Sequence, residues 1–235
     1  MNSKNDLNRL SLRYRVYLYF IEKIRSNRHI HAFLFKYRPL RESYWHVGYW
    51  DWTTLILRNA LRKHLNPDDY LLDMGTGYVG VLAIYSSLWL GCKKILAIDR
   101  LQQIITCAQK NAKHLKLEIT FSCSNLFENL NEKFDCIVFN APYIDTGSQK
   151  GALLKDELSE LRFGGGVGGG ETISRFLKSA SQHMTADGKI LLGVNHYHIS
   201  RTSMLSLISL SDLELCERIE SHFIPATAYL LKMSK

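Results

Sequence analysis

A glycine-rich turn follows a short apolar stretch in the first third of the sequence. Gly75, Gly77 and Gly80 follow residues 70–74 in the pattern Gly-x-Gly-x-x-Gly, and an apolar stretch of helical length comes next. Glycines let the backbone approach a ligand closely, and the N-terminus of the next helix offers N–H groups without intrahelical partners. Taken alone, the pattern indicates a nucleotide-type cofactor and does not say which one.

Two carboxylates flank this turn. Asp99 ends the next apolar stretch, where a carboxylate can accept hydrogen bonds from both hydroxyls of a ribose. Asp73 stands two residues before the first glycine, where it would repel the pyrophosphate of a dinucleotide but attract the ammonium and sulfonium of S-adenosylmethionine. The run Asp73-x-Gly75-Thr76-Gly77 therefore favours S-adenosylmethionine over NAD. The alternative is a tight strand-to-helix turn in which Asp73 only caps the helix.

A polar and aromatic tetrad, Asn140-Ala141-Pro142-Tyr143, follows another apolar stretch at residues 134–139. The nitrogen of an amide or an aromatic amine is a poor nucleophile because its lone pair is delocalised. An asparagine oxygen and a backbone carbonyl can accept its two N–H bonds and aim the lone pair at a methyl donor, while an aromatic ring stacks on its plane. The tetrad suits such a nitrogen; the alternative is an ordinary turn after a buried strand.

Alternating apolar stretches of strand and helix length must position these residues. The expected strands cover residues 70–74, 94–99, 118–122, 134–139 and 189–194, and the expected helices cover residues 53–61, 79–90, 101–114 and 171–183. Because each strand is continuously apolar, the pattern predicts an α/β fold with a Rossmann-like, mostly parallel sheet and helices on both faces. Residues 213–219 and 228–231 are expected to add an antiparallel pair at the C-terminal edge.

Positive charge is concentrated before the expected sheet. Residues 1–50 hold 10 of the 30 Lys and Arg residues but 3 of the 22 Asp and Glu residues, so they carry +7 of the formal charge of +8. Apolar and aromatic residues recur there at helical spacing over residues 10–37, with a break near Ser26. We expect a basic, aromatic-rich helical segment at 1–50 that can meet an anionic partner, followed by one domain at 51–235. A solvated helical face is the alternative explanation of the charge.

Four other features are less specific. The five cysteines form no Cys-x-x-Cys pair, and His196 and His198 have no third ligand at recognisable spacing, so we expect no disulfide and no metal site. No apolar run approaches the roughly 18 residues that span a bilayer, so we expect a cytoplasmic protein without a membrane contact. Residues 164–170, a glycine run, are either a mobile rim or a plain connector. The aromatic cluster at residues 44–52 is expected to dock the N-terminal helices.

Over residues 70–144 the sequence resembles class I S-adenosylmethionine-dependent methyltransferases. Among them it is similar to the release-factor glutamine methyltransferases and their small-domain relatives that methylate nucleobase amines. The resemblance is carried by residues 72–77, by residues 97–99 with Ala108 and Asn111, by residues 125–128 and by residues 134–144. It implies a class I methyltransferase sheet and S-adenosyl-L-methionine as the cofactor.

The resemblance also assigns roles to single residues. It implies cofactor binding by Asp73, Gly75, Thr76, Gly77, Asp99, Asn125 and Asn140, and catalytic roles for Asn140, Pro142 and Tyr143. Asn140 and the carbonyl of Ala141 are expected to hold the acceptor nitrogen, and Tyr143 to stack on it. Ala141 stands where the family has the first proline of Asn-Pro-Pro-Tyr. Asn125 stands where the family usually has an Asp facing the adenine amine, and its amide oxygen can accept the same bond without the charge.

The sequence thus predicts an enzyme that transfers a methyl group from S-adenosylmethionine to a planar nitrogen. The nitrogen is expected in a protein glutamine-type amide or a nucleobase amine, so the acceptor substrate is a protein, an RNA or a small molecule. The alternatives are a small-molecule methyltransferase whose N-terminal helices cap a pocket, and a non-catalytic protein that binds the cofactor. An NAD-dependent oxidoreductase is disfavoured by Asp73.

Overall fold

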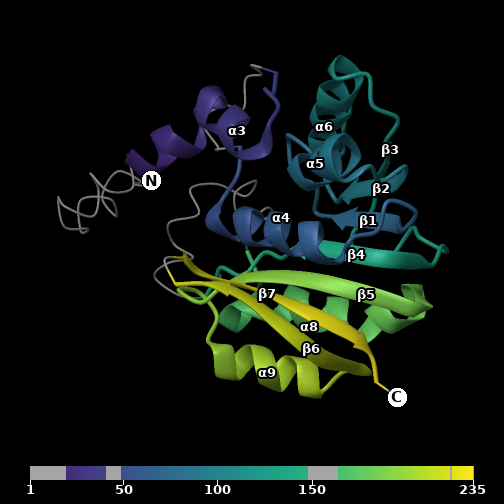
Figure 1. Cartoon of the computed structure of the whole chain (residues 1–235). Coiled ribbons are helices and arrows are strands. Elements are labelled where there is room, and N and C mark those ends of the chain that lie inside the picture. Colours follow the sequence, from purple (N-terminus) through teal and green to yellow (C-terminus); the bar gives the residue numbers. More distant parts are fainter. Residues whose placement is uncertain (1–19, 41–48, 148–163, 223, 235) are drawn as a thin grey trace.

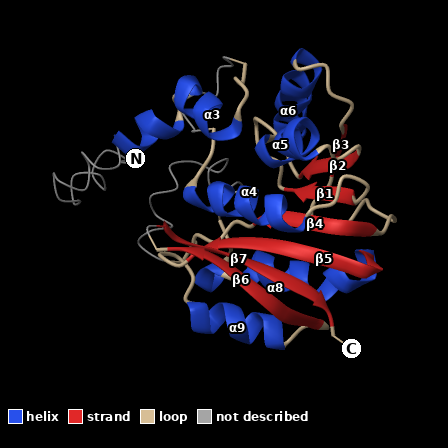
Figure 2. Cartoon of the chain, in the orientation of Figure 1, coloured by secondary structure: helices blue, strands red, loops and turns tan. Residues whose placement is uncertain are grey.

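A seven-stranded sheet forms the centre of the structure, a computed structural model that describes residues 20–40, 49–147, 164–222 and 224–234. The strands are β1 (Tyr70–Met74), β2 (Lys94–Asp99), β3 (Thr120–Cys123), β4 (Phe134–Asn140), β5 (Met184–Asn195), β6 (Leu213–Ser221) and β7 (Ile224–Met233). They lie in the order β3-β2-β1-β4-β5-β7-β6, and β7 runs antiparallel to β5 and to β6 (Figure 2). The predicted mostly parallel sheet with an antiparallel C-terminal edge is confirmed.

Helices cover both faces of this sheet (Figure 1). One side carries α4 (Trp52–His64), α5 (Val81–Leu90) and α6 (Gln102–His114), and the other carries α8 (Glu171–Ala180) and α9 (Arg201–Ser209). Leu57 of α4 is fully buried in one cluster with Leu191 of β5, and Phe176 of α8 is fully buried in another with Ile137 of β4. Each such side chain stabilises the fold by about 1.5 to 3 kcal/mol through removal of apolar surface from water.

Several elements differ from the prediction. The sequence pattern does not predict α9, because only Met204 and Ile208 of this helix are buried and its other residues are mostly polar or exposed. β5 begins at Met184, well before the predicted start, and its first residues pair with β4 past an irregular register. The end of the helix predicted at 171–183 tightens into the 3-10 helix η4 (Ser181–His183).

The described part of the N-terminal segment packs on α5. Residues 20–25 are helical and α3 (Arg28–Phe35) follows, so the helical region breaks at Ser26 as predicted. Asn27 begins α3, because its side chain accepts a hydrogen bond from the backbone N–H of His29 at 2.8 Å. The buried aromatic residues of this region, Phe35, Tyr37, Tyr49 and Trp50, form one cluster with Ile84 and Tyr85 of α5.

This cluster confirms the docking role expected of the aromatic residues that the structure describes. Tyr44, Trp45 and the predicted helical residues 10–19 lie outside the described residues. The division of the chain at residue 50 stays a prediction. Within the described ranges, no helix has both the length and the apolar character that a membrane crossing requires.

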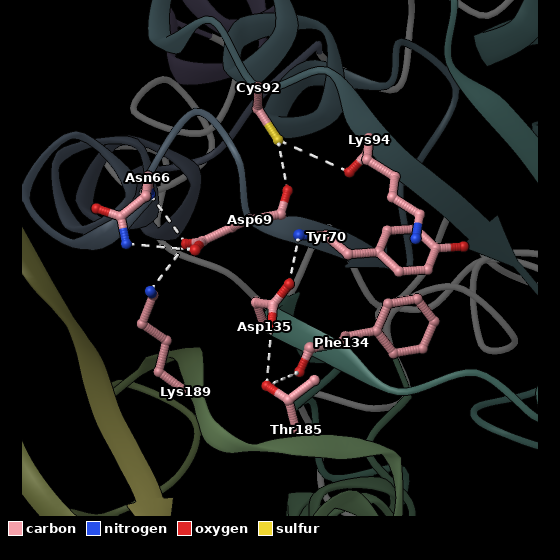
Figure 3. A network of polar contacts seen from close by, with 9 residues as sticks. All are labelled: Asn66, Asp69, Tyr70, Cys92, Lys94, Phe134, Asp135, Thr185 and Lys189. Atoms are coloured by element: carbon pink, nitrogen blue, oxygen red, sulfur yellow. Dashed lines mark hydrogen bonds and ion pairs between the residues drawn. The ribbon is translucent and has the colours of Figure 1, made fainter.

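A polar network around Asp69 ties the amino-terminal ends of β1, β4 and β5 together (Figure 3). Lys189 Nζ lies 2.8 Å from Asp69 Oδ2, and the backbone N–H of Asn66 donates to the same oxygen at 2.9 Å. Asp135 accepts from Thr185 Oγ1 at 2.8 Å. Burial opposes the charge of Asp69, but the hydrogen bonds from Lys189 and Asn66 outweigh it and hold the pKa of Asp69 below its ordinary value.

We expect Lys189→Met to lower the free energy of unfolding by about 1.5 to 3 kcal/mol at neutral pH, because Asp69 then lacks its charged partner. Since the folded-state pKa of Asp69 is lowered, its stabilising contribution is complete above about pH 4 and is lost as the pH falls through the folded pKa. The variant should therefore lose less stability on acidification than the parent protein. Urea unfolding at several pH values measures both effects.

The control is Lys178→Met, which removes an exposed lysine on α8 and should change neither quantity. Equal acid sensitivity of the parent protein and Lys189→Met would contradict the role given to this ion pair.

Candidate active site

The carboxyl ends of three neighbouring strands meet at one edge of the sheet. In the parallel register, Asp73 of β1 lies between Ala97 of β2 and Val138 of β4. The glycine turn after β1, Asp99 at the end of β2 and Asn140 at the end of β4 are therefore neighbours. The structure thus brings together the residues that the sequence predicts from three separate motifs.

The turn after β1 requires glycine at three positions. Gly75, Gly77 and Gly80 have φ angles of +67°, +68° and +69°, a region that other residues adopt only with strain. A Cβ on Gly77 would meet no described atom within 4 Å, so this side of the turn is open. The backbone N–H of Gly77 donates to Asp99 Oδ2 at 3.3 Å, which joins the turn to the end of β2.

Asp73 holds the turn from within. Its side chain is only 2% exposed, and Oδ2 accepts from Thr76 Oγ1 at 2.7 Å and from the backbone N–H of Ala83 in α5 at 3.1 Å. Burial raises the pKa of Asp73 to about 7, against the lowering effect of these two hydrogen bonds. Asp73 thus has the helix-capping role that was the alternative to direct binding. A direct contact with the cofactor stays a prediction.

Asp99 and Asn125 provide acceptors beside the turn. The Asp99 carboxylate, which is partly exposed, accepts from Gly77 and, at 3.3 Å, from the backbone N–H of Leu101. Asn125 lies after β3 and donates from Nδ2 to Glu128 Oε1 at 2.6 Å. Because the amide nitrogen faces Glu128, the oxygen of Asn125 is oriented as the acceptor of this side chain. Its contact with the adenine amine stays a prediction.

Asn140 is oriented by the N-terminus of α4. Its Nδ2 donates to Asp51 Oδ1 at 3.1 Å and to Thr54 Oγ1 at 3.3 Å. Its Oδ1 is buried, and no described residue donates a hydrogen bond to it. A buried acceptor without a donor is costly, so this oxygen has free capacity for an N–H from a bound molecule.

Tyr143 is held by the same helix end. Its hydroxyl lies 3.2 Å from Asp51 Oδ2 and 3.2 Å from Thr53 Oγ1. Burial and the nearby Asp51 carboxylate raise the pKa of Tyr143 well above its usual range, so the phenol stays neutral. The ring stacks on His198, with 5.4 Å between centroids and 26° between planes. The Tyr143 ring is thus fixed at its hydroxyl and on its His198 side.

Ala141 uses the backbone donor that the family proline lacks. Its N–H donates to the carbonyl of Gly193 in β5 at 3.4 Å, and its side chain is buried. The hydrogen bond extends the pairing of β4 with β5 beyond Asn140. The neighbouring Pro142 is partly buried. The hydrogen bond from its own N–H therefore holds Ala141 against the sheet, and this restricts the position of its carbonyl although proline is absent.

The glycine run is packed against the tetrad. The N–H of Gly165 donates to the carbonyl of Ile144 at 2.8 Å. A Cβ on Gly165 would lie 2.8 Å from Tyr143 Cα, and one on Gly169 would lie 2.5 Å from the carbonyl oxygen of Tyr143. Glycine is required here for close backbone approach, so the described residues 164–170 form a backing for Tyr143. Whether this rim moves stays a prediction.

His196 and His198 have different surroundings. His196 contacts Thr227 Oγ1 at 2.9 Å and the carbonyl of Ile199 at 3.1 Å, so both of its ring nitrogens lie within hydrogen-bonding distance of protein groups. Burial lowers its pKa. His198 instead stacks on the ring of Tyr143.

Sequence reasoning missed Asp51, Thr53 and Thr54. It placed Thr53 and Thr54 at the start of a helix expected at 53–61, and it gave neither that helix nor Asp51 a chemical role. The signal was nevertheless local: Asp51 accepts from the backbone N–H of Thr54, and Thr54 Oγ1 accepts from the backbone N–H of Asp51, which is a capping box. The pattern locates the helix start but does not reveal what else the cap touches.

Similarity to known proteins agrees with this geometry. Residues 46–167 match the family model of the methyltransferase small domain. The chain belongs to this family. It is 31% identical over 156 residues to a release factor glutamine methyltransferase of Haemophilus influenzae, a match that covers 60% of this chain and 53% of that protein. It is 34% identical over 130 residues to a ribosomal protein uL3 glutamine methyltransferase of Bordetella pertussis, covering 53% of this chain and 43% of that protein.

The chain spans about half the length of these two curated relatives. A methyltransferase structure from Pyrococcus furiosus shares the fold, with a TM-score of 0.63, 19% identity and coverage of 94% of this chain and 98% of that one. The predicted family and Rossmann-like fold are therefore confirmed, and S-adenosylmethionine is the cofactor of the family. The open side at Gly77 and the acceptors of Asp99 and Asn125 fit it, while the roles of single residues stay predictions.

We expect Gly169→Ala to disturb this site more than Gly168→Ala. Both glycines have φ of +71°, so both variants carry the same backbone strain of about 1 to 2 kcal/mol. A Cβ on Gly168 meets nothing within 4 Å, whereas one on Gly169 collides with the Tyr143 carbonyl, which adds about 1 to 3 kcal/mol. Thermal unfolding and methyl-transfer assays compare the pair. Equal losses in both variants would show that the glycine run does not support Tyr143.

Proposed function

We propose that this protein is a methyltransferase that transfers a methyl group from S-adenosylmethionine to the side-chain amide nitrogen of a protein glutamine. The observation that carries the proposal is the state of Asn140: its amide nitrogen is bound to Asp51, and its buried oxygen accepts no hydrogen bond from the described residues. Such an oxygen is complementary to one N–H of a planar amide.

The relatives support a protein acceptor. Those named above are described as methyltransferases acting on a release factor and on ribosomal protein uL3, and others act on ribosomal protein L11. None of these names refers to a nucleobase or a metabolite. A nucleobase amine, a small molecule, or cofactor binding without turnover are therefore the less favoured alternatives.

The geometry accounts for the reaction through positioning. Asn140 Oδ1 and the carbonyl of Ala141 accept the two N–H bonds of the acceptor amide, which draws the nitrogen lone pair out of conjugation. Tyr143 supports the plane of the amide from a ring that its hydroxyl contacts hold in place. When bound, the cofactor supplies an electrophilic methyl group on a sulfonium. The attacking nitrogen becomes acidic as it is alkylated, so no strong base is required of the chain.

The basic N-terminal segment is proposed to bind an anionic partner. In its described part, Lys36 and Arg38 are exposed, and Lys36 Nζ lies 5.1 Å from the centre of the Phe33 ring, which is 74% exposed. A cation beside an exposed aromatic ring suits a surface of phosphates and bases. Ribosomal RNA next to a ribosomal protein acceptor has this chemistry.

The proposed reaction is tested with Asn140→Ala. Loss of one preorganised hydrogen bond should lower turnover by on the order of 100- to 1000-fold while cofactor affinity stays nearly unchanged. Purified release factor and ribosomal proteins are incubated with methyl-labelled cofactor, and mass spectrometry locates the methyl group. Calorimetry measures cofactor affinity.

Methylation of a glutamine amide by the parent protein, lost in Asn140→Ala, is the expected result. Transfer to RNA or to metabolites alone would overturn the acceptor, and normal turnover in Asn140→Ala would overturn the role of the tetrad. Cofactor binding without transfer to any fraction would favour the non-catalytic alternative.

The anionic partner is tested by the double variant Lys36→Glu and Arg38→Glu. Deletion of the segment is unsuitable because Phe35 and Tyr37 are buried against the body of the protein. Binding to isolated ribosomal subunits should weaken and depend less on salt, because each lost phosphate contact removes a counterion-release contribution. The matched control, Lys110→Glu with Lys113→Glu, reverses two exposed charges on α6. Equal effects of the two variants would contradict a specific role of the N-terminal segment.

A further inference from the structure

We propose that Asp51 is a positioning residue for methyl transfer, which acts by orienting the Asn140 amide and the Tyr143 ring. The inference rests on the proposed function, since it explains how the two tetrad side chains are held for an acceptor amide. Asp51 lies 89 positions before Asn140 and 92 before Tyr143 in the chain, and it enters the site as the residue that begins α4.

The first step concerns the Asn140 amide. An asparagine side chain can in principle bind in two orientations, with its oxygen and nitrogen exchanged. Asp51 Oδ1, 3.1 Å away, is a carboxylate oxygen and can only accept, so it bonds the NH₂ group and repels the amide oxygen. The carboxylate therefore selects the orientation in which Asn140 Oδ1 is available to an N–H of the acceptor.

The second step concerns the other carboxylate oxygen. Helix capping requires only Oδ1, which accepts from the backbone N–H and the hydroxyl of Thr54, both at 2.7 Å. Oδ2 is not needed for the cap, yet the hydroxyl of Tyr143 donates to it at 3.2 Å. Contacts from one carboxylate to both tetrad side chains go beyond what a helix start demands.

The third step concerns the charge. A carboxylate bonds the Asn140 NH₂ more strongly than a neutral acceptor does. Its negative charge also polarises the amide and shifts electron density onto the Asn140 oxygen, which makes that oxygen a better acceptor. The hydroxyl of Tyr143 is turned toward Asp51, so the ring keeps one orientation between α4 and His198. Asp51 thus acts through Asn140 and Tyr143 and contacts the acceptor through neither of its own oxygens.

The test uses the fact that Asp, Asn and Ser are nearly equal helix caps. Asp51→Asn keeps an oxygen for Thr54 and Asn140 but places an NH₂ opposite Tyr143, whereas Asp51→Ser keeps the cap and reaches neither tetrad side chain. A positioning role predicts a graded loss of kcat, with Asp51→Ser lower by on the order of 10- to 100-fold and Asp51→Asn between it and the parent protein. KM for the acceptor protein, cofactor affinity and Tm should change little.

A capping role alone predicts equal kcat in all three proteins, and that result would overturn the inference. Asn27→Ser, at the start of α3, is the matched control for a cap substitution away from the site and should leave kcat unchanged. If Asp51→Ser has a much lower Tm than this control, Asp51→Asn still decides the question, because the inference requires its kcat to be reduced at unchanged Tm.

A double variant separates this inference from the proposed function. In the Asn140→Ala background, Asp51→Ser should cause little further loss, since Asp51 acts largely through Asn140. If Asn140→Ala is inactive and Asp51→Ser has the parent kcat, the inference fails and the proposed function stands. If Asn140→Ala retains normal turnover, the role of the tetrad fails and the inference fails with it. If the parent protein methylates no glutamine, the proposed function fails regardless of Asp51.

Discussion

The close contact between α4 and β5 is the constraint on which the site depends. Gly193 of β5 pairs with Asn140 of β4, and a Cβ on Gly193 would lie 2.6 Å from Leu57 Cδ1 and 2.7 Å from Thr53 Cγ2 of α4. Any side chain at this position would push α4 away from the sheet. Because Gly193 has none, α4 rests directly on β5 and its first residues reach the end of β4. The contacts of Asp51 with the tetrad follow from this approach.

Two asparagines at this edge of the sheet are fixed by the same kind of interaction. Asn140 donates to the Asp51 carboxylate, and Asn125 donates to the Glu128 carboxylate. In each pair the charged oxygen binds the amide nitrogen and leaves the amide oxygen as an acceptor. The site thus obtains two oriented neutral acceptors. This arrangement explains how Asn125 can stand at a position where the family usually has an aspartate.

Glycine has two distinct roles around the site. Gly75, Gly77 and Gly80 adopt positive φ angles, which allow the tight turn after β1. In the later run, Gly165 and Gly169 leave room for the backbone of Tyr143. The first role depends on the backbone conformation of the glycine itself, and the second depends on the absence of a side chain where a neighbouring backbone lies. A glycine run therefore does not by itself indicate a mobile segment.

The sequence alone determined the features that depend on neighbouring residues. The continuous apolar strands predict the parallel sheet, and the glycine pattern with Asp99 predicts the cofactor turn. Both can be predicted because local backbone conformation and burial produce a regular pattern of residue types among positions close together in the sequence. It also located Asn140 and Tyr143, since Asn140 ends the buried strand β4 and Tyr143 lies in the turn after it. The weakly patterned helix α9 was not predicted, because its few buried residues form no continuous stripe.

Only the tertiary structure decided how these pieces act together. It showed that Asp73 caps α5, that the glycine run backs Tyr143, and that Asp51 contacts residues 89 and 92 positions away. These contacts depend on how closely two elements approach, as at Gly193, and on which way a side chain points after packing. Neither the distance between two elements nor the direction of a packed side chain produces a periodic pattern in the sequence. Side chains that are distant in the chain meet only once the core between them has formed.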